Sequence, residues 1–169
     1  MSAAAEPPMI RPAKAEDIPY IHSIYSHYVL HTVTDLHHVP PTLSSFTVEY
    51  ESLTSAGLPY LVATSSSSEA QILGFIHAFP FRGYKIGYAY TCELAIICHP
   101  DATRRGVGSA LMNAFLDAIA KGGRIEQILA FMTVLEDEGE DQRVKRFYEK
   151  WGFREAGTLT GVGQKFGQR

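Results

Sequence analysis

The sequence contains little of what marks several broad classes of protein. Its charges nearly balance, with 15 basic and 18 acidic residues and a net charge of −3, and no basic stripe supports nucleic-acid binding. No apolar run approaches the ~20 residues that cross a bilayer as a helix. Its two cysteines, Cys92 and Cys98, fall in one expected strand, too far apart along it to bridge each other. We therefore expect reduced thiols in an intracellular protein.

Familiar motifs for phosphate, metal and nucleophile chemistry are missing too. A Walker loop has a lysine after its second glycine, but here Gly108 is followed by Ser109. A dinucleotide-binding fingerprint needs a third glycine where Leu111 stands. His27 and His31 have the spacing of a metal site on a helix, but a pocket or surface role is favoured because the chain has no His-Glu-x-x-His. No Ser-His or Cys-His constellation indicates nucleophilic catalysis.

What the chain does contain is enough apolar sequence for one globular domain. Its 169 residues are 46% hydrophobic, which suits a single domain with a full core. Residues 1–8 (MSAAAEPP) lack the basic start and the apolar segment of a secretory signal. We therefore expect a flexible tail over residues 1–8, a domain over residues 9–169 and a cytoplasmic location.

Strand and helix patterns alternate along this domain. An acidic segment at 136–141 is expected to be a solvated turn. Helical apolar spacing begins near residue 15 and recurs at 44–55, from 104 to the glycine pair at 122–123, and at 142–151. Strands are expected at 10–13, 59–63, 72–79, 88–98, 127–134 and 158–166. The alternation predicts an α/β sandwich with a mixed sheet.

The stretch from residue 94 to residue 111 carries the clearest functional signal. Leu94 to Cys98 is an unbroken apolar run, typical of a strand buried on both faces, and residues 99–101 (HPD) end it. Residues 104–109 (RRGVGS) then open a helix, whose N–H groups and positive dipole end favour an anion. We expect a cradle for a phosphate-bearing cofactor. The alternative is that the glycines only serve a tight strand-to-helix turn.

Two further side chains carry candidate chemistry. Glu93 is a carboxylate in the apolar segment 89–98, where it must point into a cleft or be paired. It is either a general base or one half of a structural salt bridge. Tyr148 lies on an amphipathic helix, and a tyrosine in that position is by itself more often part of the core.

These residues resemble those of the GNAT acetyltransferases. Residues 103–108 (TRRGVG) are similar to motif A, which holds the pyrophosphate of acetyl-CoA, with Thr103 where Gln or Arg is usual. Residues 148–153 (YEKWGF) resemble the segment Tyr-x-x-x-Gly-Phe. Similarity to the phosphinothricin N-acetyltransferase-like branch is found at 10–13, 24–29, 91–93 and 163–167. The resemblance implies the GNAT fold, a mixed, mostly antiparallel central sheet flanked by helices in a single domain.

The resemblance also implies roles for individual residues. Glu93 would be the general base, and Tyr148 would protonate the leaving thiolate. Arg82 could grip a carboxylate bidentately, although a solvated surface arginine is the alternative. Acetyl-CoA would be held by Leu94, Ala95, Ile96, Ile97, Arg104, Arg105, Gly106, Val107, Gly108, Ser109 and Asp141. The acceptor would meet His27, Tyr28, Arg82, Tyr90 and Lys165.

The expected function is direct acetyl transfer from acetyl-CoA to the primary amine of a small amino acid or analogue, of the phosphinothricin or methionine sulfoximine type. The expected partner is that amine, with no nucleic acid, no membrane and a homodimer as an option. A catalytically silent acyl-CoA-binding domain is the alternative, favoured by Thr103 and Asp141 and opposed by Glu93 with Tyr148. A nucleotide-dependent oxidoreductase is a third reading, but no acidic ribose ligand is located.

Overall fold

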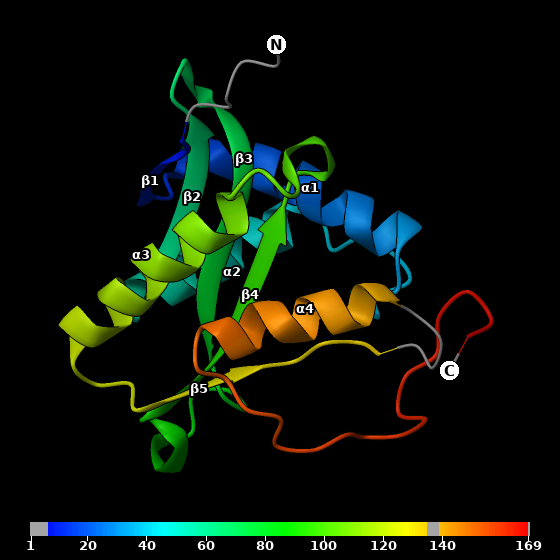
Figure 1. Ribbon diagram of the computed structural model, residues 1–169. Coiled ribbons are helices and arrows are strands. Elements are labelled where there is room, and N and C mark those ends of the chain that lie inside the picture. Colours follow the sequence, from blue (N-terminus) through cyan, green and yellow to red (C-terminus); the bar gives the residue numbers. More distant parts are fainter. Residues whose placement is uncertain (1–6, 135–138, 169) are drawn as a thin grey trace. The chain divides into compact units, whose positions relative to one another are not determined.

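The computed structural model describes residues 7–134 and 139–168 (Figure 1). The chain divides into two units. The first runs up to Ser26 and continues from Pro41 to Phe131, and the second contains His27–Pro40 and the chain from Met132 onward. Residues 1–6 of the expected tail lie outside the described residues, and the domain bounds expected at 9–169 stay a prediction.

A five-stranded sheet forms the framework of the first unit. Its strands lie in chain order: β1 (Met9–Pro12), β2 (Tyr60–Ser65), β3 (Ser68–Pro80), β4 (Thr91–Cys98) and β5 (Gln127–Ala130). Neighbouring strands are antiparallel except β4 and β5, which are parallel because helix α3 (Val107–Gly122) connects them as a crossover. The expected mixed, mostly antiparallel sheet is confirmed.

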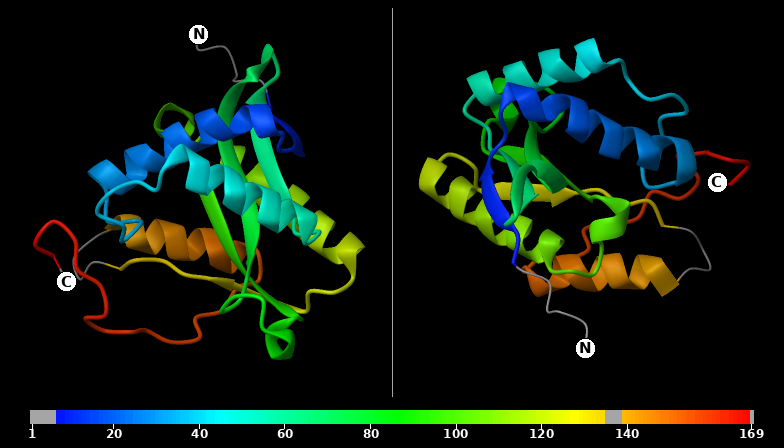
Figure 2. Two further views of the ribbon diagram at one scale, coloured as in Figure 1. Left: turned by 180° about the vertical axis from the view of Figure 1, so that it is seen from behind. Right: turned by 90° about the horizontal axis from the view of Figure 1, so that it is seen from above.

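Helices cover both faces of this sheet. Helix α3 packs on one face, where Leu111 approaches Gly74 of β3. Helix α2 (Leu43–Ser55) packs on the other, where the ring centroid of Tyr50 lies 5.4 Å from that of Tyr60 in β2. Figure 2 shows α2 and the first part of α1 (Ile18–His31) on the face opposite to α3. In the part of the chain that is described, no helix combines the length and the hydrophobicity needed to cross a membrane.

Strand alternation divides the core of the first unit between the two faces. Phe75 and His77 face α2, whereas Gly74 and Ile76 face α3, and all four are buried. Gly74 permits a close approach of backbones, because a Cβ at this position would lie 2.8 Å from the carbonyl oxygen of Ile97 in β4. The register of β3 against β4 therefore depends on a residue without a side chain.

Most elements expected from the sequence are present, with shifted ends. The strand expected at 88–98 begins at Thr91, and the strand expected at 127–134 ends at Ala130. Helix α4 (Gly139–Lys150) begins earlier than expected and takes up the end of the acidic segment. Residues 136–138 of that segment lie outside the described residues.

The strand expected at 158–166 is wrong. Among the described residues, no strand follows α4, and Lys165 forms only an isolated bridge with Gln168. Gly161 has a φ of 70°, a left-handed conformation that breaks an extended run. Leu159 is largely exposed, so the apolar residues of this segment have no sheet face against which alternation could bury them.

An ion pair joins β1 to the turn that precedes α1. Asp17 lies in the 3₁₀ turn Ala15–Asp17 and is 6% exposed. Arg11 donates to its carboxylate through two nitrogens, at 2.6 and 2.9 Å, and the backbone N–H of Lys14 donates at 2.8 Å. Burial by itself raises the pKa of Asp17, but the hydrogen bonds from Arg11 and Lys14 outweigh burial and lower it below its usual range.

Removing the charge of Asp17 should destabilise the protein. Asp17→Asn weakens charge-assisted hydrogen bonds of a buried group, with an expected loss of ~1–3 kcal/mol in the free energy of unfolding at neutral pH. Because the pKa is lower in the folded state than in the unfolded state, the contribution of Asp17 is present above about pH 4 and is lost as the pH falls through the folded pKa. Urea denaturation from neutral to strongly acid pH measures both effects.

The matched control for this prediction is Asp117→Asn, which changes an exposed aspartate on α3. We expect its free energy of unfolding to stay within about 0.5 kcal/mol of the wild-type value. Equal stability of the two variants at neutral pH would contradict the role given to Asp17.

Candidate active site

Strand β4 loses one of its two partners part of the way along its length. It pairs with β3 up to Cys98, but with β5 only up to Leu94, because β5 ends at Ala130. The expected burial on both faces is confirmed for Leu94 and wrong for residues 95–98, which are half-buried. This edge of β4 leaves backbone N–H and C=O groups open to an extended ligand that carries amides, in the manner of an added strand.

The turn after β4 positions the N-terminus of α3. Gly106 has a φ of 81° and precedes Val107, the first residue of the helix. Among the described residues, no neighbouring atom lies within 4 Å of a Cβ placed on Gly106, so this glycine serves the left-handed turn and not a close contact. The N–H groups of Val107, Gly108 and Ser109 have no intrahelical acceptor and lie at the positive end of the dipole. An anion suits this position.

Two exposed arginines precede the helix. Arg104 has a φ of 59°, which is uncommon for a residue with a side chain. Arg105 donates a long hydrogen bond of 3.5 Å to the carbonyl oxygen of Asp101. It also lines a pocket of about 200 Å³ together with Ser65, Ser66, Ser67, Gln71 and Leu73. The charges of Arg104 and Arg105 add to the attraction of the helix N-terminus for a phosphate group.

Glu93 lies in the half of β4 that still has both neighbours. Phe79 of β3 and Leu129 of β5 flank it in the sheet, and it is half-buried. Within the described part of the chain, Glu93 makes no ion pair and no hydrogen bond, which removes the support for a structural salt bridge. A half-buried carboxylate of this kind can accept a proton from a bound ligand.

The two cysteines lie on the opposite face of β4 from Glu93. Cys92 is buried and, as expected, faces away from Glu93 by strand alternation. Burial, together with the charge of Glu93, raises the pKa of the Cys92 thiol to about 11. Burial also raises the pKa of Cys98 to about 11. Both thiols are protonated near neutral pH, so neither is an activated nucleophile.

Arg82 and Tyr90 lie in the connection between β3 and β4. Both side chains are exposed, and Arg82 has a φ of 51° in the turn after Pro80. The carbonyl oxygen of Tyr90 accepts hydrogen bonds from the N–H groups of Glu126, at 2.8 Å, and Gln127, at 3.0 Å. These bonds tie the connection to the start of β5. Both side chains are accessible to a ligand at the end of the sheet where β4 begins.

In the second unit, Tyr148 lies on α4 among aromatic side chains. Its ring centroid is 5.5 Å from that of Phe147 and 5.4 Å from that of Phe153. Burial raises the pKa of Tyr148 to about 12, so its hydroxyl is protonated near neutral pH and can donate a proton. Asp141, an expected cofactor contact, belongs to α4, but its side chain lies outside the described residues.

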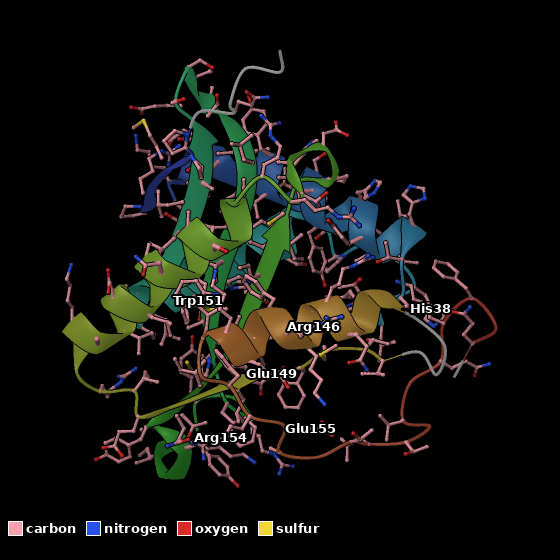
Figure 3. The ribbon with its side chains drawn as sticks, in the orientation of Figure 1. His38, Arg146, Glu149, Trp151, Arg154 and Glu155 are labelled. Carbon is pink, nitrogen blue, oxygen red and sulfur yellow. The ribbon has the colours of Figure 1, made fainter. Side chains whose placement is uncertain are left out.

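The chain after α4 is tied back to that helix. Lys145 donates to the carboxylate of Glu155 at 2.6 Å, and the Thr158 hydroxyl donates to the same carboxylate at 3.3 Å. Figure 3 labels Glu155 on this returning segment and Arg146 and Glu149 on the helix. Because Lys145 and Glu155 are exposed, this pair adds little to stability and chiefly orients the segment.

The remaining expected acceptor ligands also belong to the second unit. His27 and Tyr28 lie in the last turns of α1, and the His27 ring centroid is 5.6 Å from that of Tyr28 and 4.9 Å from that of His31. Lys165 is 1% exposed, and its Nζ donates to the carbonyl oxygen of Asp35 at 2.5 Å. Burial lowers the pKa of Lys165, against the opposing effect of Asp35. Lys165 therefore joins two segments of this unit, and its ammonium is already hydrogen-bonded.

One buried residue has no role among those expected from the sequence. His77 in β3 is 3% exposed, and burial lowers its pKa to about 3, so it is neutral at working pH. By strand alternation it faces the same side of the sheet as Glu93. The available signal in the sequence is a single titratable side chain inside the apolar segment 72–79 (ILGFIHAF).

Known proteins resemble the chain over most of its length. Residues 57–155 match the family described as acetyltransferase (GNAT) domain. An N-acetyltransferase of Streptomyces griseus is 34% identical over 164 residues, which are 95% of this chain and 81% of that protein. A phosphinothricin N-acetyltransferase of Alcaligenes faecalis is 31% identical over 159 residues, which are 94% of this chain and 76% of that protein.

A solved structure has the same fold. It is the crystal structure of a GNAT superfamily phosphinothricin acetyltransferase from Sinorhizobium meliloti in complex with acetyl-CoA, with a TM-score of 0.86 and 25% identity over 96% of this chain and 83% of that one. The open edge of β4 and the N-terminus of α3 fit the amide arm and the phosphates of such a donor. The chain is therefore an N-acetyltransferase with acetyl-CoA as its donor, and it belongs to the GNAT family, in the phosphinothricin N-acetyltransferase-like branch.

Proposed function

We propose that the enzyme transfers the acetyl group of acetyl-CoA directly to the primary amine of a small amino acid or analogue, of the phosphinothricin or methionine sulfoximine type. The observation that carries this proposal is Glu93, a half-buried carboxylate without a partner among the described residues. It lies next to Leu94, the last residue of β4 that pairs with β5. The named activity of the Alcaligenes faecalis relative supports the acceptor class.

The donor site would use two features of the first unit. The open edge of β4 can hydrogen-bond the amides of the donor's arm, and the first turn of α3 can bind its phosphates. When bound, acetyl-CoA supplies the activated thioester. The residues proposed to hold it are Leu94, Ala95, Ile96 and Ile97 on β4, Arg104, Arg105, Gly106, Val107, Gly108 and Ser109 around the turn, and Asp141 by resemblance.

Two proton transfers are assigned to the enzyme's own side chains. Glu93 accepts a proton from the acceptor's ammonium group, because only the neutral amine has a lone pair with which to attack. Tyr148 donates its proton to the leaving thiolate sulfur, a role that its raised pKa permits. Cys92 and Cys98 take no part, since burial keeps both thiols protonated. The transfer is therefore direct, without a covalent acyl-enzyme.

Acceptor recognition is assigned to exposed polar side chains. Arg82 offers a guanidinium that can bind an α-carboxylate bidentately, and Tyr90 lies at the other end of the same connection. The resemblance adds His27 and Tyr28 from α1. It also adds Lys165, which would act by holding its segment in place, because its Nζ is already bound to the carbonyl oxygen of Asp35.

A thiol-release assay with acetyl-CoA and a panel of amino acids tests the proposal. The panel contains phosphinothricin, methionine sulfoximine, glutamate and methionine, each with its N-blocked form as a control. We expect acceptor-dependent release of CoA for at least one free amine and none for its N-blocked form. Absence of release for every free amine would contradict the acceptor class, and a silent acyl-CoA-binding domain predicts that result.

A bulky side chain in the N-terminal turn of α3 should reduce the affinity for the donor. Gly108→Val places a branched side chain beside the N–H groups that would meet the phosphates, so the Kd for CoA should rise about tenfold or more while the fold is retained. Calorimetric titration with CoA measures this. The control is Gly122→Ala at the other end of α3, where a Cβ meets no described atom within 4 Å. An unchanged Kd in folded Gly108→Val would remove the donor site from this turn.

Tyr148 predicts an effect on turnover rather than on binding. Tyr148→Phe keeps the ring contacts but removes the proton, so kcat should fall about tenfold or more with an unchanged Kd for CoA. With a pKa of about 12, Tyr148 should cause no loss of rate on the alkaline side up to about pH 10. Steady-state kinetics measure kcat of this variant. The control is Tyr20→Phe, which changes an exposed tyrosine on α1. A Phe variant with full kcat would indicate a core tyrosine.

Glu93 predicts the largest loss of rate. Glu93→Gln keeps the shape of the side chain but removes proton acceptance, so kcat/KM at neutral pH should fall by about a hundred- to ten-thousand-fold. Raising the pH should restore part of the rate, because more of the acceptor amine is then already neutral. Measurements of kcat/KM across pH, together with the melting temperature, distinguish a general-base role of Glu93 from a structural role. The exposed Glu126→Gln is the control, and wild-type rates in folded Glu93→Gln would overturn the mechanism.

A further inference from the structure

His77 is placed by the register of the sheet beside the proposed general base. It pairs with Tyr60 of β2 on one side and with Ala95 of β4 on the other. Two residues further along β3, Phe79 pairs with Glu93. Strand alternation therefore puts the side chains of His77 and Glu93 on the same face of the sheet, as diagonal neighbours on adjacent strands.

The surroundings of His77 are aromatic. The Tyr60 ring stacks on the imidazole with a centroid distance of 4.4 Å and an interplanar angle of 16°. The Phe79 ring meets it edge to face at 4.3 Å, and the Phe75 ring lies at 5.9 Å. A phenylalanine at this position would fill the same space and keep these ring contacts. Packing by itself therefore gives no reason for an imidazole.

The ring nitrogens of His77 lack partners within the described part of the chain. Nδ1 is buried and accepts or donates no hydrogen bond, and none is formed by Nε2. A buried polar group left without a partner costs ~1–3 kcal/mol, which a phenylalanine would avoid. Because burial lowers its pKa to about 3, the imidazole is neutral and carries one N–H. A neutral imidazole without a protein partner is suited to hold a water molecule.

The neighbour of His77 on β4 has a small side chain. Ala95 has the smallest side chain of β4, and it is the first residue beyond the end of β5 pairing. Diagonal neighbours on antiparallel strands have Cβ atoms about 7 Å apart, and both the imidazole and the carboxylate extend from those atoms. One water molecule can span such a distance with a hydrogen bond to each side chain.

We propose that His77 is a positioning residue for the acetyl transfer, whose imidazole N–H holds the water that carries the acceptor's proton to Glu93. The water oxygen accepts hydrogen bonds from His77 Nε2–H and from the ammonium group, and the water donates one hydrogen to the Glu93 carboxylate. One N–H bond of the ammonium breaks as the water takes that proton, and the water passes one of its own protons to Glu93. The water and the imidazole end unchanged. This inference rests on the proposed role of Glu93 as base.

The first experiment compares two substitutions that each remove one buried polar group and keep a ring. His77→Phe should lower kcat about tenfold or more, with KM for both substrates and the Kd for CoA unchanged, and with stability equal or higher. Tyr60→Phe is the matched control, because the Tyr60 hydroxyl is also buried without a partner among the described residues and its ring stacks on His77. We expect its kcat to equal that of the wild type. Wild-type kcat in His77→Phe would overturn the proposal.

A conservative variant tests the N–H directly, because a purely structural role of His77 predicts no recovery of kcat. His77→Gln places an amide N–H near the position of Nε2–H, so it should recover part of the rate lost in His77→Phe. If His77→Phe does not fold, His77→Leu replaces it under the same criterion, since leucine also lacks a hydrogen-bonding group. Equal kcat in the apolar and the amide variants would contradict the role of the N–H.

A double-mutant cycle separates failure of this inference from failure of the proposed function. If His77 acts through Glu93, then His77→Phe should cause no further loss of kcat in the Glu93→Gln background. Independent, multiplying losses would overturn the relay. If kcat is reduced in Glu93→Gln but equals the wild-type value in His77→Phe, only the role of His77 is overturned. Wild-type rates in Glu93→Gln would remove the base itself, and the relay with it.

Discussion

The unequal pairing of β4 determines where the sheet of the first unit leaves backbone groups for a ligand. Pairing with β3 continues to Cys98, whereas pairing with β5 stops at Leu94. A strand with two partners has its backbone groups satisfied, and a strand that loses one partner has donors and acceptors that a ligand can use. Glu93 lies just before that point and Ala95 just after it. The proposed base and the proposed donor edge are therefore brought together by one strand, without any long-range adjustment.

Alternation along β4 keeps two kinds of reactive group apart. Cys92 and Cys98 lie on the face that α3 covers, where burial keeps their thiols protonated. Glu93 lies on the other face, with His77 as a diagonal neighbour. A shift of one residue in the register would exchange the thiols and the carboxylate. Gly74 resists such a shift, because any other residue there would press on the carbonyl oxygen of Ile97.

Local sequence was sufficient for most of this framework. Period-two and period-3.6 apolar patterns depend on which face a residue buries. They predicted every strand of the sheet and the four α-helices that the described residues form. The strand expected at 158–166 failed because alternation without a sheet neighbour buries nothing, and Gly161 turns the chain there. The Nζ of Lys165 donates to the carbonyl oxygen of Asp35, a contact across a separation in sequence that no local pattern encodes.

The sequence by itself determined the elements, the glycine turn before α3 and the identity of the candidate base, because each depends on neighbouring residues or on a short motif. Only the tertiary structure decided that β5 ends at Ala130 and leaves the later part of β4 open. It also decided that Glu93 has no ion-pair partner among the described residues and that His77 is its diagonal neighbour. These are properties of register between strands distant in the chain, and register is set by packing across the sheet, which a single strand's sequence does not contain.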